Sequence, residues 1–164
     1  MKRLLSGKLS LAVIALMFVS YSAAWAQPPA TVNVLVDIKP GSCINPFNVK
    51  SKGVVPVVIL GSTDVDVTQI DPLSITLAGV KPIRSKVVDV ATPPDPAIGC
   101  EELGPDGFAD LALKFRTQDI VAVLDPTVKN GDTVVLTLTG TLVDEVTPIQ
   151  GEDSILVKKP GKKK

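Results

Sequence analysis

Short runs in which Val, Ile and Leu alternate with polar residues constrain the fold of this chain more than any other feature. In TVNVLVDI (residues 31–38) and in TVVLTLTGTLVD (residues 133–144), every second position is largely aliphatic and many of the positions between are polar. Because successive side chains of a strand point to opposite faces of a sheet, this pattern predicts strands that are buried on one face. The same alternation predicts that Leu111, Leu113 and Phe115 face a common core.

Further strands are predicted where apolar runs are bounded by Gly, Pro, Asn or Asp, at residues 53–60, 73–80, 83–90 and 154–158. The run at 53–60 is apolar on both faces, which indicates a strand covered on both sides. Pro56 places that strand at an edge or a bulge, because proline cannot donate to a neighbouring strand. Only TQDIVAVLD (residues 117–125) is expected to be helical, with Thr117 as its N-cap. Seven to eight short strands with at most one short helix predict an all-β fold, an antiparallel β-sandwich of the immunoglobulin-like kind.

The N-terminal segment, residues 1–26, has the features of a secretory signal peptide. A basic start is followed by a largely apolar stretch at residues 9–23, and Ala24-Trp25-Ala26 gives the small-x-small pattern of a cleavage site. We therefore expect a secreted or periplasmic protein, with residues 1–26 removed by cleavage after Ala26. An uncleaved membrane anchor is the alternative, but the cleavage pattern argues against it. No other segment is long and apolar enough to be expected as a transmembrane segment.

The chain that remains after this cleavage is of a length that suits one domain with a buried core, expected at residues 27–157. Between these limits acidic residues outnumber basic ones, which is not the pattern of a protein that binds nucleic acid. Residues 158–164 form a Lys-rich tail that is predicted to be disordered. Such a tail either solubilises the chain or contacts an anionic surface through Lys158, Lys159, Lys162, Lys163 and Lys164.

Two cysteines remain after the signal peptide, Cys43 and Cys100. In an exported chain two cysteines most simply form one disulfide, and two free thiols are the alternative. The bridge would close the long loop that runs from Cys43 to Cys100. In the chain-entropy model, closing a loop of this size stabilises the folded state by about 4 kcal/mol.

Several classes of chemistry are excluded because the chain contains no histidine. Ser-His-Asp and Cys-His catalysis and histidine-based zinc sites are therefore absent, and two cysteines cannot complete a tetrahedral thiolate site. Paired carboxylates could still serve a glycosidase. However, after the signal peptide the chain has no Trp or Tyr to present a sugar-binding face, so we expect that the protein is not an enzyme.

The stretch CEELGPDGFADLALKF (residues 100–115) carries half of the ligand pattern of a calcium loop. When it is aligned on the glycine of such loops, the candidate ligands are the carboxylates of Glu102, Asp106 and Asp110 and the main-chain carbonyl of Phe108. Calcium takes six to eight oxygen ligands, so waters or a distant residue would have to complete this site. The alternative is a simple turn, because a Pro-Asp-Gly sequence favours one before the next strand. A second acidic pair, Asp64 and Asp66, fits either one strand face or a solvated loop.

Three segments together resemble a secreted domain of uncharacterised function that recurs in environmental bacteria and archaea. They are VDIKPGSCINPFNVKSKGVVPVVILGSTDVDVTQIDPLSI, GPDGFADLALKFRTQDI and GDTVVLTLTGTL, and the similarity spans residues 31–157. The resemblance implies an extracellular β-rich module without an established activity or ligand. The resemblance also implies a fuller acidic loop before the last strand of the second segment, and this chain departs from that loop at Glu102 and Gly104.

Two functions follow as hypotheses from the sequence. The first is a non-catalytic exported module with a structural or adhesive role, stabilised by one disulfide. The second is a calcium-dependent module that binds a polysaccharide or another extracellular surface.

Overall fold

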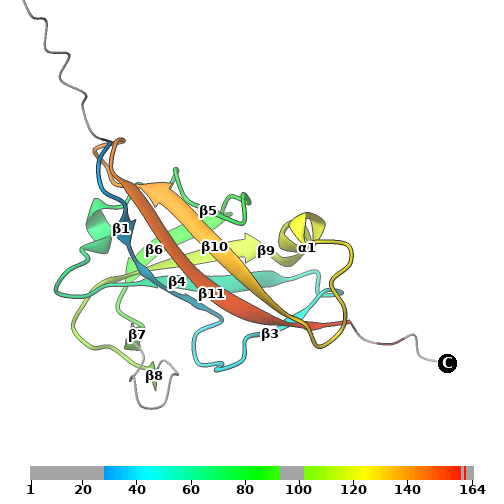
Figure 1. Ribbon diagram of the computed structural model, residues 1–164. Helices are drawn as coiled ribbons and strands as arrows, with labels where there is room; N and C mark the ends of the chain where they lie inside the picture. The colour runs from blue at the N-terminus through cyan, green and yellow to red at the C-terminus, as the bar shows by residue number, and fades with distance from the viewer. Residues whose placement is uncertain (1–27, 93–101, 160, 162–164) are drawn as a thin grey trace, which may run out of the picture.

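Two packed β-sheets form the body of the protein in the computed structural model, which describes residues 28–92, 102–159 and 161 (Figure 1). One sheet has five strands in the order β1-β11-β10-β5, with β3 also paired to β11, and the other has four in the order β2-β4-β9-β6. The pairings are antiparallel except for β1 and β3, which run parallel to β11. Over the residues described, the structure confirms a β-rich fold of two mostly antiparallel sheets with one α-helix. Its two main sheets hold nine strands, so the predicted number of seven to eight was too low.

The first sheet contains β1 (Val32–Asn33), β3 (Pro46–Asn48), β5 (Thr76–Leu77), β10 (Thr133–Thr141) and β11 (Pro148–Lys158). The second sheet contains β2 (Leu35–Ile38), β4 (Val54–Leu60), β6 (Arg84–Val88) and β9 (Asp110–Arg116). The remaining elements are the strand pair β7 (Ala91–Thr92) and β8 (Glu102–Leu103), the 3-10 helix η1 (Val67–Gln69) and the helix α1 (Thr117–Val123). The long β10–β11 hairpin lies in front of the second sheet in Figure 1.

The stretch predicted as one strand at residues 31–38 is divided between the two sheets. β1 pairs with β11 in the first sheet, and β2 pairs with β4 in the second. Val34 connects them and donates a backbone hydrogen bond to Gln150. Gly151 permits this crossing, because a Cβ atom at its position would lie 2.4 Å from the carbonyl oxygen of Val34. The alternating sequence therefore predicted the strand conformation correctly, but it could not indicate the change of sheet.

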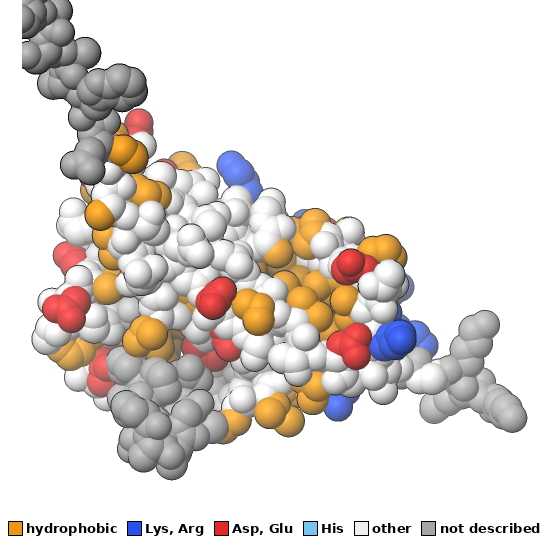
Figure 2. All heavy atoms as spheres, viewed as in Figure 1, with side chains coloured by type: hydrophobic (Ala, Val, Ile, Leu, Met, Phe, Trp, Pro, Cys, Tyr) orange, Lys and Arg blue, Asp and Glu red, His pale blue; other side chains and the backbone are white. Residues whose placement is uncertain are grey.

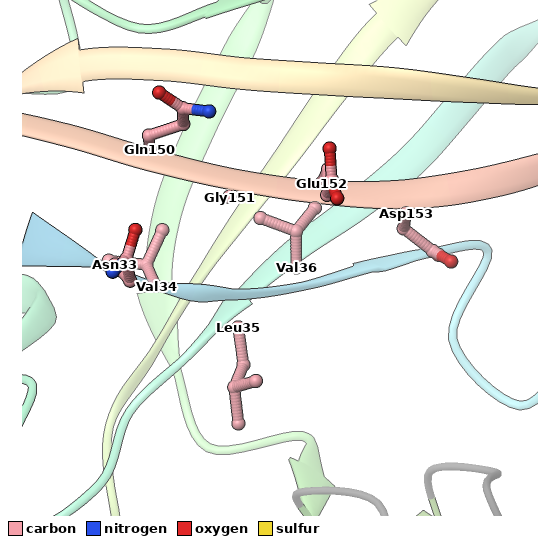
Figure 3. Close-up of a pocket in the computed structure, with 8 residues that line it drawn as sticks. All are labelled: Asn33, Val34, Leu35, Val36, Gln150, Gly151, Glu152 and Asp153. Atoms are coloured by element: carbon pink, nitrogen blue, oxygen red, sulfur yellow. The ribbon is translucent and has the colours of Figure 1, made fainter.

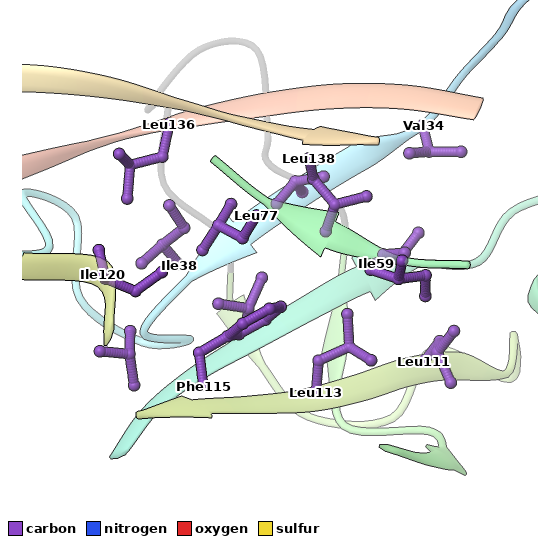
Figure 4. Close-up of a cluster of buried hydrophobic side chains, with 14 of the residues drawn as sticks. Val34, Ile38, Ile59, Leu77, Leu111, Leu113, Phe115, Ile120, Leu136 and Leu138 are labelled. Atoms are coloured by element: carbon purple, nitrogen blue, oxygen red, sulfur yellow. The ribbon is translucent and has the colours of Figure 1, made fainter. Parts of the chain in front are cut away.

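An aliphatic core fills the space between the sheets (Figure 4). From β9, Leu111, Leu113 and Phe115 point into it with exposed fractions of 1% or less, which confirms the prediction for these residues. Leu136 and Leu138 reach the same core from β10 on the opposite sheet. A separate cluster on the outer side of β4, containing Val58, Leu60 and Ala91, explains why that strand is apolar on both faces.

Pro56 does not lie on an edge strand, contrary to the prediction. β4 is an inner strand between β2 and β9. The carbonyl oxygen of Pro56 accepts a hydrogen bond from Lys39, the residue after the end of β2. Lys39 has a positive φ of 64°, so the chain turns away from β4 at this point. The missing N–H of Pro56 therefore falls where β2 has already ended, and an inner strand can accommodate the proline.

The predicted helix is present but shorter than expected. Thr117 is its first helical residue, and Arg116 occupies the N-cap position without a side-chain capping bond. The helix is held to the sandwich by Ile120, which is completely buried in the core. Among the described residues, no helix has both the length and the apolar character that a membrane span requires. The predicted signal peptide at residues 1–26 lies outside the described residues.

Candidate functional site

The acidic turn before β9 is held by a carboxylate that the sequence analysis did not identify. Asp89 Oδ1 accepts a hydrogen bond of 3.0 Å from the backbone N–H of Asp106, and Asp89 Oδ2 accepts one of 3.0 Å from Gly107. Asp106 in turn accepts a 2.9 Å hydrogen bond from the N–H of Phe108. Gly107 has a φ of 92°, a conformation that glycine adopts without steric cost. The expected turn is therefore present, and a residue 17 positions earlier in the chain fixes it.

Asp110 follows this turn and is almost completely buried, with an exposed fraction of 1%. Its Oδ1 atom accepts a hydrogen bond of 3.0 Å from Gly61 at the end of β4. Its Oδ2 atom accepts hydrogen bonds of 2.9 Å from Val90 and 3.1 Å from Ala91, at the start of β7. Hydrogen bonds from several amides offset the cost of burying a carboxylate. Asp110 therefore joins three segments of the chain through their backbones.

The other predicted calcium ligands lie around the same turn. Glu102 belongs to β8, where its backbone pairs with Thr92 of β7, and Phe108 is exposed by 39%. The carboxylates of Asp106 and Asp110 both accept hydrogen bonds from backbone N–H groups. Within the part of the chain that the structure describes, no three His, Cys, Asp or Glu side chains are grouped closely enough to hold a metal ion. Calcium binding at this turn stays a prediction.

A groove of about 420 Å³ lies between β11 and the chain that crosses from β1 to β2 (Figure 3). It exists because β11 is only partly covered along this edge: β1 pairs with residues 149–150, and β3 with residues 156–158. Gln150 and Glu152 project from β11 at the groove, and the Leu35 side chain on the crossing chain points away from β11. The groove is lined by Asn33, Val34, Leu35, Val36, Gln150, Gly151, Glu152 and Asp153.

Asp153 closes one end of this groove with a hydrogen-bond network. Its Oδ2 atom accepts bonds of 2.7 Å from the N–H of Ile38 and 2.8 Å from the side-chain amide of Asn45. Glu152 is the neighbouring carboxylate and is exposed. Successive strand residues point to opposite faces, so the Glu152 and Asp153 side chains diverge. They therefore lack the convergent placement that the two carboxylates of a glycosidase require.

The pair Asp64 and Asp66 lies in the loop before η1, so the solvated-loop interpretation is correct. Asp66 caps this short helix, accepting hydrogen bonds from the Thr68 hydroxyl at 2.6 Å and the Thr68 N–H at 2.9 Å. These bonds, the hydroxyl bond foremost, hold the pKa of Asp66 below its usual value. Both aspartates border a small cavity of about 230 Å³ that Val65 and Ile70 also line.

The predicted disulfide and the predicted tail are described only in part. Cys43 lies exposed in the connection between β2 and β3, and Cys100 lies outside the described residues, so the bridge stays a prediction. Lys158 is the last residue of β11, and the N–H of Lys159 donates a 2.7 Å hydrogen bond to Asn130. The folded domain thus extends past the predicted boundary at residue 157, as far as Lys159. Residues 162–164 lie outside the described part of the chain.

Comparisons of the chain with protein-family models, with curated proteins and with solved structures found no match.

Proposed function

We propose that this protein is a non-catalytic, exported β-sandwich module with a structural or adhesive role outside the cytoplasm. The observation that carries the proposal is that aspartates near the candidate sites accept hydrogen bonds from the protein's own backbone. Asp89, Asp110 and Asp153 each accept hydrogen bonds from backbone N–H groups of other segments. A catalytic or metal-binding carboxylate must instead offer its oxygens to a ligand.

These hydrogen bonds support a module whose loops are held firmly to its sheets. Asp110 joins segments 49 and 20 residues away, and Asp153 joins β11 to the end of β2, 115 residues away. Charge-assisted hydrogen bonds of this kind are stronger than neutral ones. A stiff sandwich with wide sheet faces suits a protein that presents a surface.

The alternative function is a calcium-dependent binding module that uses Glu102, Asp106, Asp110 and the Phe108 carbonyl. The observation that favours it is the backbone at Gly107, whose φ of 92° fits the sharp turn that calcium loops place at their glycine. In this alternative, ion binding would draw Asp106 Oδ1 away from the N–H of Phe108.

Two finer features belong to the proposal. The topology is immunoglobulin-like, which the two stacked, mostly antiparallel sheets support. Cys43 and Cys100 form a disulfide, which follows from the exported character that the N-terminal segment indicates.

A thermal unfolding experiment on residues 27–164 separates the two functions. We expect the same midpoint in millimolar calcium as in a chelator, and no stoichiometric metal in the purified protein. The matched variant is Asp106→Asn, which keeps an acceptor for the Phe108 N–H but removes the charge that calcium needs. If calcium raises the midpoint of the unaltered protein but not that of the variant, the calcium-dependent module is the correct function. Release of new reducing ends from any tested polysaccharide would contradict a non-catalytic role.

A further inference from the structure

The outer face of the second sheet carries a stripe of basic side chains. Arg84 and Lys86 of β6 and Lys114 and Arg116 of β9 are all exposed. In the register of the sheet, Arg84 lies directly opposite Lys114, and Lys86 lies opposite Ala112. Directly opposed residues of antiparallel strands point to the same face, so all four cations share the face that β10 and β11 do not cover.

The register also gives the direction of the stripe. Residues two apart on one strand lie about 7 Å apart, and neighbouring strands lie about 5 Å apart. The stripe therefore runs diagonally across β6 and β9, in the order Lys86, Arg84, Lys114 and Arg116. Lys52 continues it, because Lys52 and Arg116 line one hollow of about 310 Å³ at its end.

This concentration of charge is unfavourable for the isolated sheet. Like charges directly opposite each other destabilise a strand pair, and Arg84 and Lys114 are such a pair. None of the four cations on β6 and β9 forms an ion pair with a residue that the structure describes. Together with Lys52, these four cations are more than half of the basic residues between positions 27 and 157. Over the same range, acidic residues outnumber basic ones. An anionic ligand would relieve the repulsion.

The outer face of the first sheet has a different character. Its outward residues on β10 and β11 include Thr137, Thr139 and Gln150, with Glu152 and, at the end of β11, Lys158 as charged exceptions. Figure 2 views the molecule from this side and shows a mostly uncharged surface with scattered carboxylates and a few Lys or Arg side chains. Of the five basic residues on the strands of the two sheets, four therefore lie on the outer face of the second sheet.

We propose that this basic stripe binds a linear acidic polysaccharide, a sugar polymer that carries carboxylate or sulfate groups. The inference rests on the proposed function and names the class of partner for an adhesive module. A single file of cations matches a polymer with anions along its length, and Arg84 and Arg116 can each hold a carboxylate or sulfate through two parallel hydrogen bonds.

The hollow at the end of the stripe favours a sugar polymer over other polyanions. Beside Lys52 and Arg116 it presents Asp119 and Gln118. The amide nitrogen of Gln118 donates to backbone oxygens of Val49 and Ser51, which leaves its Oε1 atom to accept from a ligand. Sugar hydroxyls are donors that these acceptors can bind next to the cations. The hollow has no aromatic lining residue on which a sugar ring or a nucleic-acid base could stack, so its cations and polar acceptors would have to hold the polymer.

Binding of residues 27–164 to heparin and to polygalacturonate, with dextran as the neutral control, tests the proposal. We expect salt-sensitive binding to both acidic polymers and none to dextran. The variant Arg84→Gln with Lys114→Gln should weaken binding by about tenfold or more. The matched control, Lys129→Gln with Lys158→Gln, removes the same charge from exposed positions away from this face and should leave the affinity nearly unchanged. The Arg84/Lys114 variant should unfold at the same midpoint as the unaltered protein or at a higher one, which separates lost binding from lost folding.

Three outcomes would overturn the proposal. They are unchanged binding by the Arg84/Lys114 variant, equal losses in the two double variants, and equal or tighter binding of single-stranded DNA or anionic vesicles through the same residues. Two other results would contradict the proposed function, whatever the variants show. Binding that requires calcium would favour the calcium-dependent module, and shortening of the polymer by the protein would contradict a non-catalytic role. If the acidic polymers do not bind and calcium does not change the unfolding midpoint, the polysaccharide inference alone is wrong.

Discussion

Asp153 Oδ2 accepts a hydrogen bond of 2.7 Å from the backbone N–H of Ile38, and this bond connects the two sheets of the sandwich. Asp153 belongs to β11 of the first sheet, and Ile38 is the last residue of β2 in the second. The same oxygen accepts a 2.8 Å hydrogen bond from Asn45, which precedes β3. One carboxylate therefore fixes both ends of the connection from β2 to β3.

Replacement of Asp153 by Ala should lower the free energy of unfolding by about 2–3 kcal/mol. The change leaves the N–H of Ile38 and the buried amide of Asn45 without their charged acceptor, and unsatisfied buried donors cost this much. Urea denaturation measures the effect. Glu152→Ala is the matched control, because Glu152 is adjacent and exposed, and its replacement should change the free energy by about 0.5 kcal/mol at most. Equal effects of the two changes would remove Asp153 from this role.

Gly151→Ala should also destabilise the protein, by about 1–3 kcal/mol or more. Its Cβ atom would lie 2.4 Å from the Val34 oxygen and 2.6 Å from a methyl group of Val36, so the crossing chain would have to shift. Gly53→Ala is the control, because a Cβ atom there has only Ser51 Oγ nearby, at 3.5 Å. Chemical denaturation of both variants makes the comparison. A Gly151→Ala protein as stable as the control would show that the crossing has room for a methyl group.

The parts of the fold that the sequence predicted are those where burial follows the alternation. In β9, Leu111, Leu113 and Phe115 are all inward, and no polar residue occupies an inward position between them. In β11 the inward positions include Gly151 and Asp153, which interrupt the alternation of apolar and polar residues. The strand was therefore expected to begin at residue 154, but it begins at Pro148. Both residues are explained by contacts with distant parts of the chain. Gly151 leaves room for the crossing chain at Val34, and Asp153 accepts the hydrogen bond from Ile38. A single sequence does not contain these reasons in any local pattern.

The candidate site shows the same limit. The sequence correctly indicated a turn at Asp106-Gly107, because turn chemistry is local. It offered Asp110 as a metal ligand, but the structure surrounds that carboxylate with N–H groups of Gly61, Val90 and Ala91. The basic stripe was missed because its members lie on strands separated in the sequence, and only the register of β6 and β9 aligns them.

Stability should fall when the pH drops below about 4, partly through three exposed aspartates. Hydrogen bonds from Thr68, Thr127 and Thr147, those of their hydroxyl groups foremost, lower the pKa values of Asp66, Asp125 and Asp144 respectively. A carboxyl group whose pKa is lower in the folded state stabilises that state above its unfolded pKa. This contribution is lost as the pH falls through the lower, folded pKa.

Denaturation at a series of pH values measures this loss, with Asp144→Asn as the test variant. Asn keeps an acceptor for the N–H groups of Val146 and Thr147 but does not titrate, so the variant should show a shallower decline in acid. Asp64→Asn is the control, because no described residue donates a hydrogen bond to the Asp64 side chain. If both variants follow the curve of the unaltered protein, the bonds to Asp144 make no pH-dependent contribution.

Reduction of the predicted bridge between Cys43 and Cys100 should lower the thermal midpoint of residues 27–164. The loop between the two cysteines regains its freedom in the unfolded chain when the bridge opens, and the chain-entropy model assigns about 4 kcal/mol to this change. The unfolding midpoint with and without a reducing agent measures the effect. The double variant Cys43→Ser with Cys100→Ser should unfold near the midpoint of the reduced protein and should not respond to the reducing agent. Two titratable thiols in the untreated protein, together with a midpoint that reduction does not change, would show that the cysteines are free.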